Sequence, residues 1–131
     1  LSQTKHINNW DLVDLSAPQI VGQFLLNKDR DILYKLAESD LLWDNRIAIV
    51  STLTFIRNND LDDTYRLSLK MMNHKHDLMH KAIGWMLREA GKRDAKRLYD
   101  FVMENKSIMP RTMLRYSIEK FDIETRKELM R

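Results

Sequence analysis

Apolar residues recur along the chain at the three- and four-residue spacing of a helix, and no segment reads as a strand. Within residues 77–90, for example, one face consists of Met79, Ile83, Met86, Leu87 and Ala90. The pattern predicts a short helix capped by Asn8 or Asn9 and ending at Asp14, followed by helices over about residues 16–26, 29–38, 41–57, 61–73, 77–90, 94–105, 110–120 and 123–131. The predicted fold class is all-α.

Capping and stop signals set the ends of several of these helices. Ser16–Gln19 has the form of a capping box with proline in the first turn. Asp60 and Asp122 are expected to cap the helices that follow them, and Gly91 is expected to end the helix before it. Pro110 stands where another helix is expected to begin, because proline is tolerated in a first turn.

Three of the predicted helices can be overlaid on one another at an offset of 34 or 35 residues. The overlay places Arg46, Lys81 and Arg115 at one equivalent position. A helical period of this length is typical of stacked antiparallel helix pairs, so we expect an α-solenoid of HEAT-like repeats. The curvature of a solenoid creates a concave groove, and the three cations would line one wall of it.

The composition is that of a globular domain. The chain has 131 residues, of which 44% are hydrophobic and 31% charged, and it contains only three glycines and two prolines. Cysteine is absent, which excludes disulfides and cysteine-based metal sites and is compatible with the reducing cytoplasm, where we expect the protein. The longest apolar run, residues 47–50, is far shorter than the roughly 20 residues that span a bilayer, so no membrane partner is expected.

Trp85 interrupts the amphipathic pattern of its helix. It lies away from the apolar stripe, among Lys81, Arg88 and Lys92. Net charge is only +3, so the placement of cations is more informative than their number. Trp85 either packs against a neighbouring repeat with lysine stems over its edges, or forms an aromatic platform flanked by phosphate-binding cations. Both interpretations stay open.

Arg46 shows the converse anomaly, since it falls on the apolar side of its helix, between Leu42, Ile49, Val50 and Leu53. A buried guanidinium without a partner costs several kcal/mol, so Arg46 must be paired or must open into a cavity. It is either half of a structural ion pair or an anion-binding arginine at a groove.

Three histidines, His74, His76 and His80, lie close together in the sequence, but no carboxylate is suitably placed to complete a tetrahedral metal site. Lys75 and Lys81 would also repel a cation, so we expect local capping roles and no metal. Trp10 and Asp14 are one helical turn apart on one face. Because no glycine-rich phosphate loop, G-x-S-x-G or HExxH motif is present, Asp14 is the leading candidate for catalytic chemistry.

Four segments resemble, in order, signature blocks of the AlkD-like DNA alkylation repair enzymes, from the C-terminal part of that family. The segments are Asn9–Asp14 (NWDLVD), Leu42–Ile49 (LWDNRIAI), His76–Glu89 (HDLMHKAIGWMLRE) and Met109–Tyr116 (MPRTMLRY). Relatives often carry another charged residue in place of the Asp44–Asn45 pair, which bears on the pairing of Arg46. We therefore expect a single HEAT-like domain over residues 1–131 that is the C-terminal fragment of a longer chain.

The resemblance implies a DNA glycosylase that removes cationic alkylated purines without a cofactor. It implies that Asp14 is the catalytic aspartate, that Trp10 and Trp85 face the lesion, and that Arg46 is the active-site arginine. DNA-backbone contacts are expected from Lys81, Arg88, Lys92, Arg93 and Arg115. The expected partner is duplex DNA with alkylated bases, bound by a monomer.

Two alternatives to an enzyme stay open, a non-catalytic solenoid that binds DNA and a protein-interaction scaffold. The scaffold would show no salt-sensitive binding to DNA. A fragment without the preceding repeats would lack part of the groove, so we expect it to bind DNA weakly and to excise bases poorly or not at all.

Overall fold

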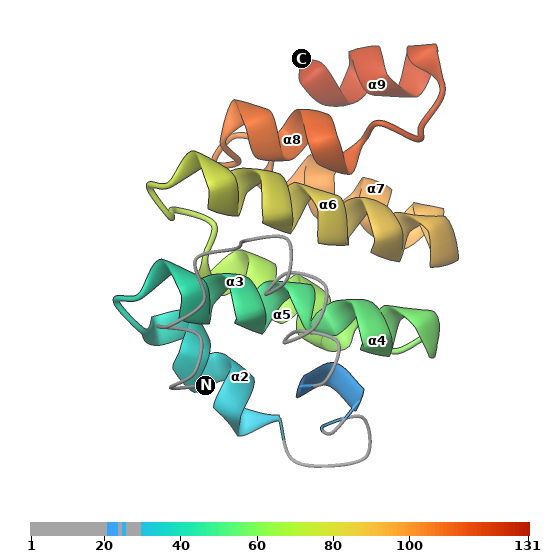
Figure 1. Cartoon of the computed structure of the whole chain (residues 1–131). Helices are drawn as coiled ribbons and strands as arrows, with labels where there is room; N and C mark the ends of the chain where they lie inside the picture. The colour runs from blue at the N-terminus through green and yellow to red at the C-terminus, as the bar shows by residue number, and fades with distance from the viewer. Residues whose placement is uncertain (1–20, 24, 26–29) are drawn as a thin grey trace.

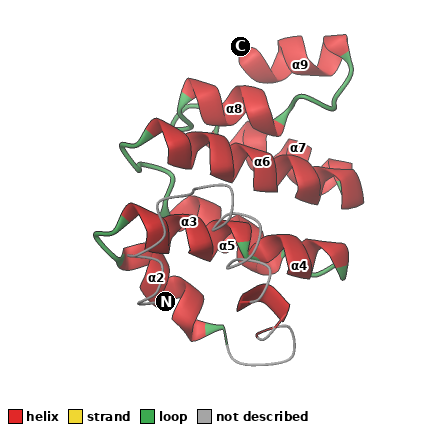
Figure 2. Cartoon of the chain, viewed as in Figure 1, coloured by secondary structure: helices red, strands yellow, loops and turns green. Residues whose placement is uncertain are grey.

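The computed structural model describes residues 21–23, 25 and 30–131. Within these residues the chain forms helices and no strands, as the sequence predicts (Figure 2). Residues 21–23 and 25 are helical, and the remaining helices are α2 (Asp31–Glu38), α3 (Leu42–Val50), α4 (Thr52–Arg57), α5 (Asp62–Lys70), α6 (Asp77–Arg93), α7 (Ala95–Asn105), α8 (Arg111–Ser117) and α9 (Ile123–Met130). The Ser16–Gln19 capping box, Trp10 and Asp14 lie outside the described residues.

The helices are arranged in two layers. Helices α3, α6 and α8 lie one above another, with α5 and α7 behind them and α9 at the end of the stack (Figure 1). Helix α6 is the centre of this packing, since it contacts α3, α4, α5, α7 and α8. One continuous apolar core runs from Leu25 to Leu129 and includes the fully buried Phe55, Met86 and Met113.

The helix expected over residues 41–57 is interrupted at Ser51, so that α3 and α4 are separate helices. The Ser51 hydroxyl donates to the Ile47 carbonyl oxygen (2.5 Å), and the Thr52 hydroxyl donates to the Ile49 carbonyl oxygen (2.6 Å). Hydroxyl groups that hydrogen-bond to the preceding turn in this way bend helices. The chain therefore continues from α3 into α4 in a helical direction, but the two are not one continuous α-helix.

Contrary to the expectation from the sequence, Gly91 does not end its helix. Helix α6 continues to Arg93, and the cap of the next helix is Asp94, whose Oδ1 accepts a hydrogen bond from the Arg97 amide (3.1 Å). Gly91 instead lies against Leu98 of α7, where an added Cβ would come within 2.3 Å of Leu98 Cδ2. Its small size serves the packing of two helices.

Asp60 does not cap α5, whose N-cap residue, Leu61, makes no side-chain cap. The Asp60 carboxylate instead accepts a hydrogen bond from Arg30 (2.7 Å), which also donates to Asp63 (2.6 Å). Asp122 does cap α9, through the Thr125 amide (2.8 Å), and α8 begins directly after Pro110. Among the helices described, none has the length and apolar character needed to cross a membrane.

Candidate nucleic-acid interface

A pocket of about 290 Å³ opens between α3, α6 and α8. Three cations and two aromatic rings from these three helices line it. The lining residues are Arg46, Leu78, Lys81, Ala82, Trp85, Arg88 and Tyr116. Four of the residues selected from the sequence, Arg46, Lys81, Trp85 and Arg88, thus meet in one place.

Trp85 is half-buried and has two environments. The residue packs against the apolar core, and it also lines the pocket. The two interpretations of this tryptophan therefore describe different sides of one side chain. Core packing fixes the indole, so that the part of the ring facing the pocket is held without freedom to turn.

Arg46 is half-buried, whereas Asn45 next to it is buried with 4% of its surface exposed. The Arg46 Nη1 donates a long hydrogen bond to the Leu78 carbonyl oxygen (3.4 Å) at the start of α6, and the side chain lines the pocket. The structure thus corrects the position inferred from the helical pattern. The buried polar site on α3 belongs to Asn45, and Arg46 lies at the edge of the core, where it reaches the pocket.

The Asp44–Asn45 pair serves the packing of α3 on the end of α2. Asn45 Nδ2 donates to the carbonyl oxygens of Leu36 (2.9 Å), Ser39 (3.0 Å) and Ala37 (3.2 Å). Asp44 Oδ2 accepts a hydrogen bond from the Ser39 hydroxyl (2.8 Å). This departure from the usual block therefore stabilises the helix that carries Arg46.

The cations of the pocket differ in how strongly they are neutralised. Arg88 makes a short ion pair with Glu119, just after α8 (2.6 Å), and its buried Nε lacks a hydrogen bond in the described part of the chain but lies 3.8 Å from Glu89 Oε2. Lys81 is 3.6 Å from Asp77 on its own helix, and both side chains are well exposed. An exposed contact of this length contributes little, so Lys81 remains able to bind an anion.

The other predicted cations lie apart from this pocket. Lys92 lines a neighbouring pocket that shares Arg88 and makes an ion pair with Glu89 (2.8 Å). Arg93 is exposed at the last residue of α6, and Arg115 lines a different pocket, between α8 and α9. The structure therefore groups Lys81 and Arg88 but not Lys92, Arg93 and Arg115 around Trp85.

Tyr116 was not among the site residues predicted from the sequence, although it brings a second ring to the pocket. Its position depends on Gly84, where an added Cβ would lie 2.6 Å from Tyr116 Cβ and 2.8 Å from the Met113 carbonyl oxygen. A glycine in the middle of a helix is unfavourable unless close packing requires it. Gly84 was therefore the available signal that another helix lies against this turn of α6.

The three histidines organise the turn before α6. His76 caps this helix, because its ring nitrogen accepts from the Leu78 amide (3.3 Å), and His74 Nδ1 accepts from the His76 amide (3.0 Å). His80 Nε2 is in hydrogen-bond contact with the His74 carbonyl oxygen. These contacts confirm the expected capping roles. Over residues 21–23, 25 and 30–131, no group of three or more potential ligands is suitably placed for a metal ion.

A family model described as DNA alkylation repair enzyme matches residues 1–121. The chain belongs to the DNA alkylation repair enzyme family. Among curated proteins, none matches the chain. Membership in the family indicates an enzyme that repairs alkylated DNA.

Proposed function

We propose that the protein is a DNA glycosylase of base-excision repair, which hydrolyses the N-glycosidic bond of cationic alkylated purines such as N3-methyladenine and N7-methylguanine. The observation that carries this proposal is the pocket lined by Arg46, Lys81, Trp85 and Arg88 in a chain of the DNA alkylation repair enzyme family. Cations and an aromatic ring at one site suit the phosphates and sugars of a DNA backbone.

The chemistry requires little from the protein at the base. Alkylation at N3 or N7 makes the purine cationic, so it is already a good leaving group and needs no general acid. As the glycosidic bond breaks, positive charge develops on the deoxyribose, and the transition state resembles an oxocarbenium ion. A carboxylate near the sugar stabilises this charge and can position the attacking water.

We assign the carboxylate role to Asp14, with Trp10 beside it; both precede the described residues and are assigned from the family pattern alone. Trp85 would cradle the sugar–phosphate backbone and stabilise the developing cation, at about 0.5–2 kcal/mol for a cation–π contact. Arg46 would hold a phosphate near the lesion, since a guanidinium can donate two parallel hydrogen bonds to it. Lys81 and Arg88 would bind adjacent phosphates.

The order of the helices supports a HEAT-like solenoid as the scaffold of this site. Helices α3, α6 and α8 lie side by side, and α5 and α7 form the second layer (Figure 1). In such a solenoid one layer lines the concave surface, and the layer of α3, α6 and α8 carries the pocket with Trp85. We propose that a DNA duplex lies along this layer.

The test is release of bases from a methylated DNA duplex, with Asp14→Asn as the deciding variant. The full-length wild-type protein should release N7-methylguanine or N3-methyladenine, and Asp14→Asn in that protein should lower the single-turnover rate by orders of magnitude while DNA binding persists. Asp100→Asn is the matched control, because Asp100 is an exposed residue of α7 that pairs with Lys96, and its loss should leave the rate unchanged.

Two results would overturn the proposal in different ways. Excision by Asp14→Asn at the wild-type rate would remove Asp14 from the mechanism. Tight binding of methylated or abasic DNA by the wild-type protein without any base release would indicate a non-catalytic DNA-binding protein.

A further inference from the structure

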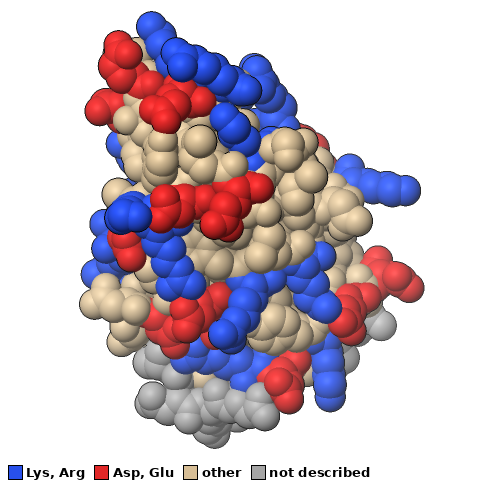
Figure 3. Space-filling view, turned by 180° about the vertical axis from the view of Figure 1, so that it is seen from behind, with Lys and Arg blue, Asp and Glu red and all other residues tan. Residues whose placement is uncertain are grey.

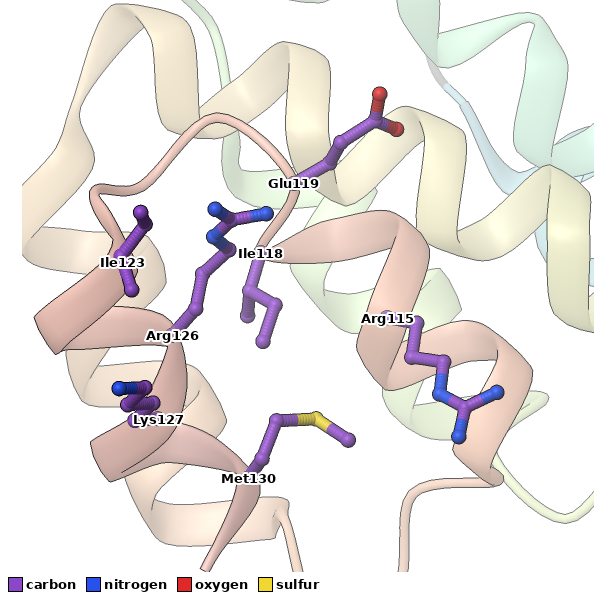
Figure 4. A pocket seen from close by; sticks show the side chains of 7 residues that line it. All are labelled: Arg115, Ile118, Glu119, Ile123, Arg126, Lys127 and Met130. Carbon is purple, nitrogen blue, oxygen red and sulfur yellow. The ribbon is translucent and has the colours of Figure 1, made fainter.

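A second basic pocket, of about 330 Å³, lies between α8 and α9. Figure 4 shows Ile118, directly after α8, and Arg126 of α9 facing the space between the two helices, with Met130 and Lys127 farther along α9. The residues that line it are Arg115, Ile118, Glu119, Ile123, Arg126, Lys127 and Met130. An apolar floor is thus bordered by three cations and one carboxylate.

The single carboxylate does not neutralise these cations. Glu119 points away from α9 in Figure 4, and its Oε2 lies 2.6 Å from Arg88 on α6. Within the region that the structure describes, no carboxylate is within ion-pair distance of Arg115, Arg126 or Lys127. The pocket therefore has a local excess of positive charge.

Arg126 gives a second, independent indication that the pocket suits an anion. Its Nε is buried, yet it has no hydrogen-bond partner in the part of the chain described. Asp122, one turn earlier, caps α9 through the Thr125 amide (2.8 Å) and acts on Arg126 electrostatically, without an ion pair. Burying an unsatisfied donor of a charged group costs free energy, and an anion bound to the Arg126 guanidinium would offset part of this cost.

The two basic pockets are neighbours. The Arg88–Glu119 ion pair links them, since Arg88 lines the pocket with Trp85 and Glu119 lines the pocket between α8 and α9. Arg115 and Tyr116, adjacent residues of α8, also line one pocket each. A long polyanion bound at the first pocket could therefore continue to the second.

We propose that the pocket between α8 and α9 is a binding site for the phosphodiester backbone of DNA, held by Arg126 and Lys127 together with Arg115. The cations suit the phosphates, and Ile118, Ile123 and Met130 suit the less polar faces of the deoxyriboses. Helix α9 follows residue 121, where the family match ends, so this site would extend the DNA contact beyond the matched segment. The inference rests on the proposed function for its ligand.

The test compares two double variants that lose the same charge. In Arg126→Gln/Lys127→Gln, the slope of log Kobs against log salt concentration for a DNA duplex should become shallower by roughly two, because each lost phosphate contact removes about 0.9 from it. Lys35→Gln/Arg57→Gln is the control, since both residues are exposed on α2 and α4, far from α9, and should keep the wild-type slope (Figure 1).

A direct measurement accompanies the slopes. The side-chain Nε–H resonance of Arg126 should shift when duplex DNA is added, because a phosphate binds to the same guanidinium. Equal slopes for the two double variants, or an Arg126 resonance that does not respond to DNA, would overturn the inference. If Arg126→Gln/Lys127→Gln lost as much affinity for an oligomer of glutamate as for duplex DNA, the choice of a phosphodiester as the ligand would be overturned.

These results separate the inference from the proposed function. If the protein binds duplex DNA with the expected slopes but releases no methylated base, the α8–α9 site is supported and the glycosylase proposal is contradicted. If the protein excises bases but Arg126→Gln/Lys127→Gln binds DNA like the wild type, the glycosylase proposal is supported and the α8–α9 site is contradicted.

Discussion

Asn45 and His74 form a fully satisfied polar contact near the candidate site. The Asn45 amide nitrogen serves three carbonyl oxygens, so its Oδ1 is left to accept from His74 Nε2 (3.0 Å). His74 Nδ1 accepts from the His76 amide and therefore carries no proton. The two contacts define a neutral imidazole with its proton on Nε2, and a second proton would break the contact to His76.

This arrangement predicts that the protein loses stability on acidification. Burial, followed by the nearby His76 and His80, lowers the pKa of His74 below its ordinary value of 6.5. The unfolded chain therefore takes up a proton before the folded protein does, so the contribution is present above about pH 6.5 and is lost as the pH falls below it. The loss should be under about 1 kcal/mol because the ring is only half-buried.

The measurement is the urea midpoint of the wild type and of His74→Gln at pH 7.5 and pH 5.5. The variant should be less stable at pH 7.5 but should lose less additional stability on acidification. An equal loss in the two proteins would show that His74 is not the titrating group.

At the scale of elements, two glycines set the distances between α6 and its neighbours. A Cβ at Gly84 would meet the Met113 carbonyl oxygen at 2.8 Å, which is backbone of α8 and can move only with the helix. A Cβ at Gly91 would meet chiefly the end of the Leu98 side chain, which can rotate. The same substitution should therefore have different effects at the two positions.

We expect Gly84→Ala to destabilise the protein by about 1–3 kcal/mol, the typical cost of overpacking between fixed elements. Gly91→Ala should change the free energy of unfolding by less than about 1 kcal/mol, because the higher helix propensity of alanine offsets the displacement of Leu98. Urea denaturation of the two variants checks both values. Equal destabilisation of the two would mean that α8 can move away from α6 as easily as Leu98 can rotate.

The helices could be predicted from the sequence because their apolar positions recur at helical spacing, and local signals determine some of their ends, as at Pro110 and Asp122. The interruption at Ser51 could not, since hydroxyl groups at helical positions do not reveal which carbonyl they will bind. The expectations for Gly91 and Asp60 were wrong for a related reason. Glycine often ends a helix and aspartate often caps one, but here Gly91 packs against Leu98 and Asp60 pairs with Arg30.

The candidate site was predictable to the extent that it breaks the amphipathic pattern. Trp85 and Arg46 stood out because each is unusual on its face of the helix, and both line the pocket. Tyr116 and the buried Asn45 did not stand out, because their positions depend on which helices lie against each other. Periodicity identifies the face of a helix but not the residue of another helix that meets it.

For the whole molecule, basic residues outnumber acidic ones in the linings of the two pockets described above. Figure 3 views the side opposite to that of Figure 1, where Lys and Arg are interspersed with Asp and Glu. The pocket lined by Trp85 and the pocket between α8 and α9 each have three basic residues in their linings, and together they have one acidic residue, Glu119. A polyanion would therefore be attracted to these two pockets.

The continuity of the core leads to a prediction about unfolding. The apolar cluster extends from Leu25 to Leu129, and α9, at the end of the stack, is anchored by the fully buried Leu129. Stacked helical repeats unfold together when the interfaces between neighbours are strong. We therefore expect one cooperative transition, with no stage in which α8 and α9 are lost first.

The positions of the tryptophans make this testable. Trp10, Trp43 and Trp85 all precede α7, but Trp85 shares a pocket with Tyr116 of α8, so the fluorescence also responds to the docking of α8, whereas circular dichroism at 222 nm reports on every helix, α9 included. The two signals should give the same urea midpoint. If the ellipticity fell at lower urea than the fluorescence changed, α9 would unfold independently, and the α8–α9 pocket would then exist only while α9 is docked.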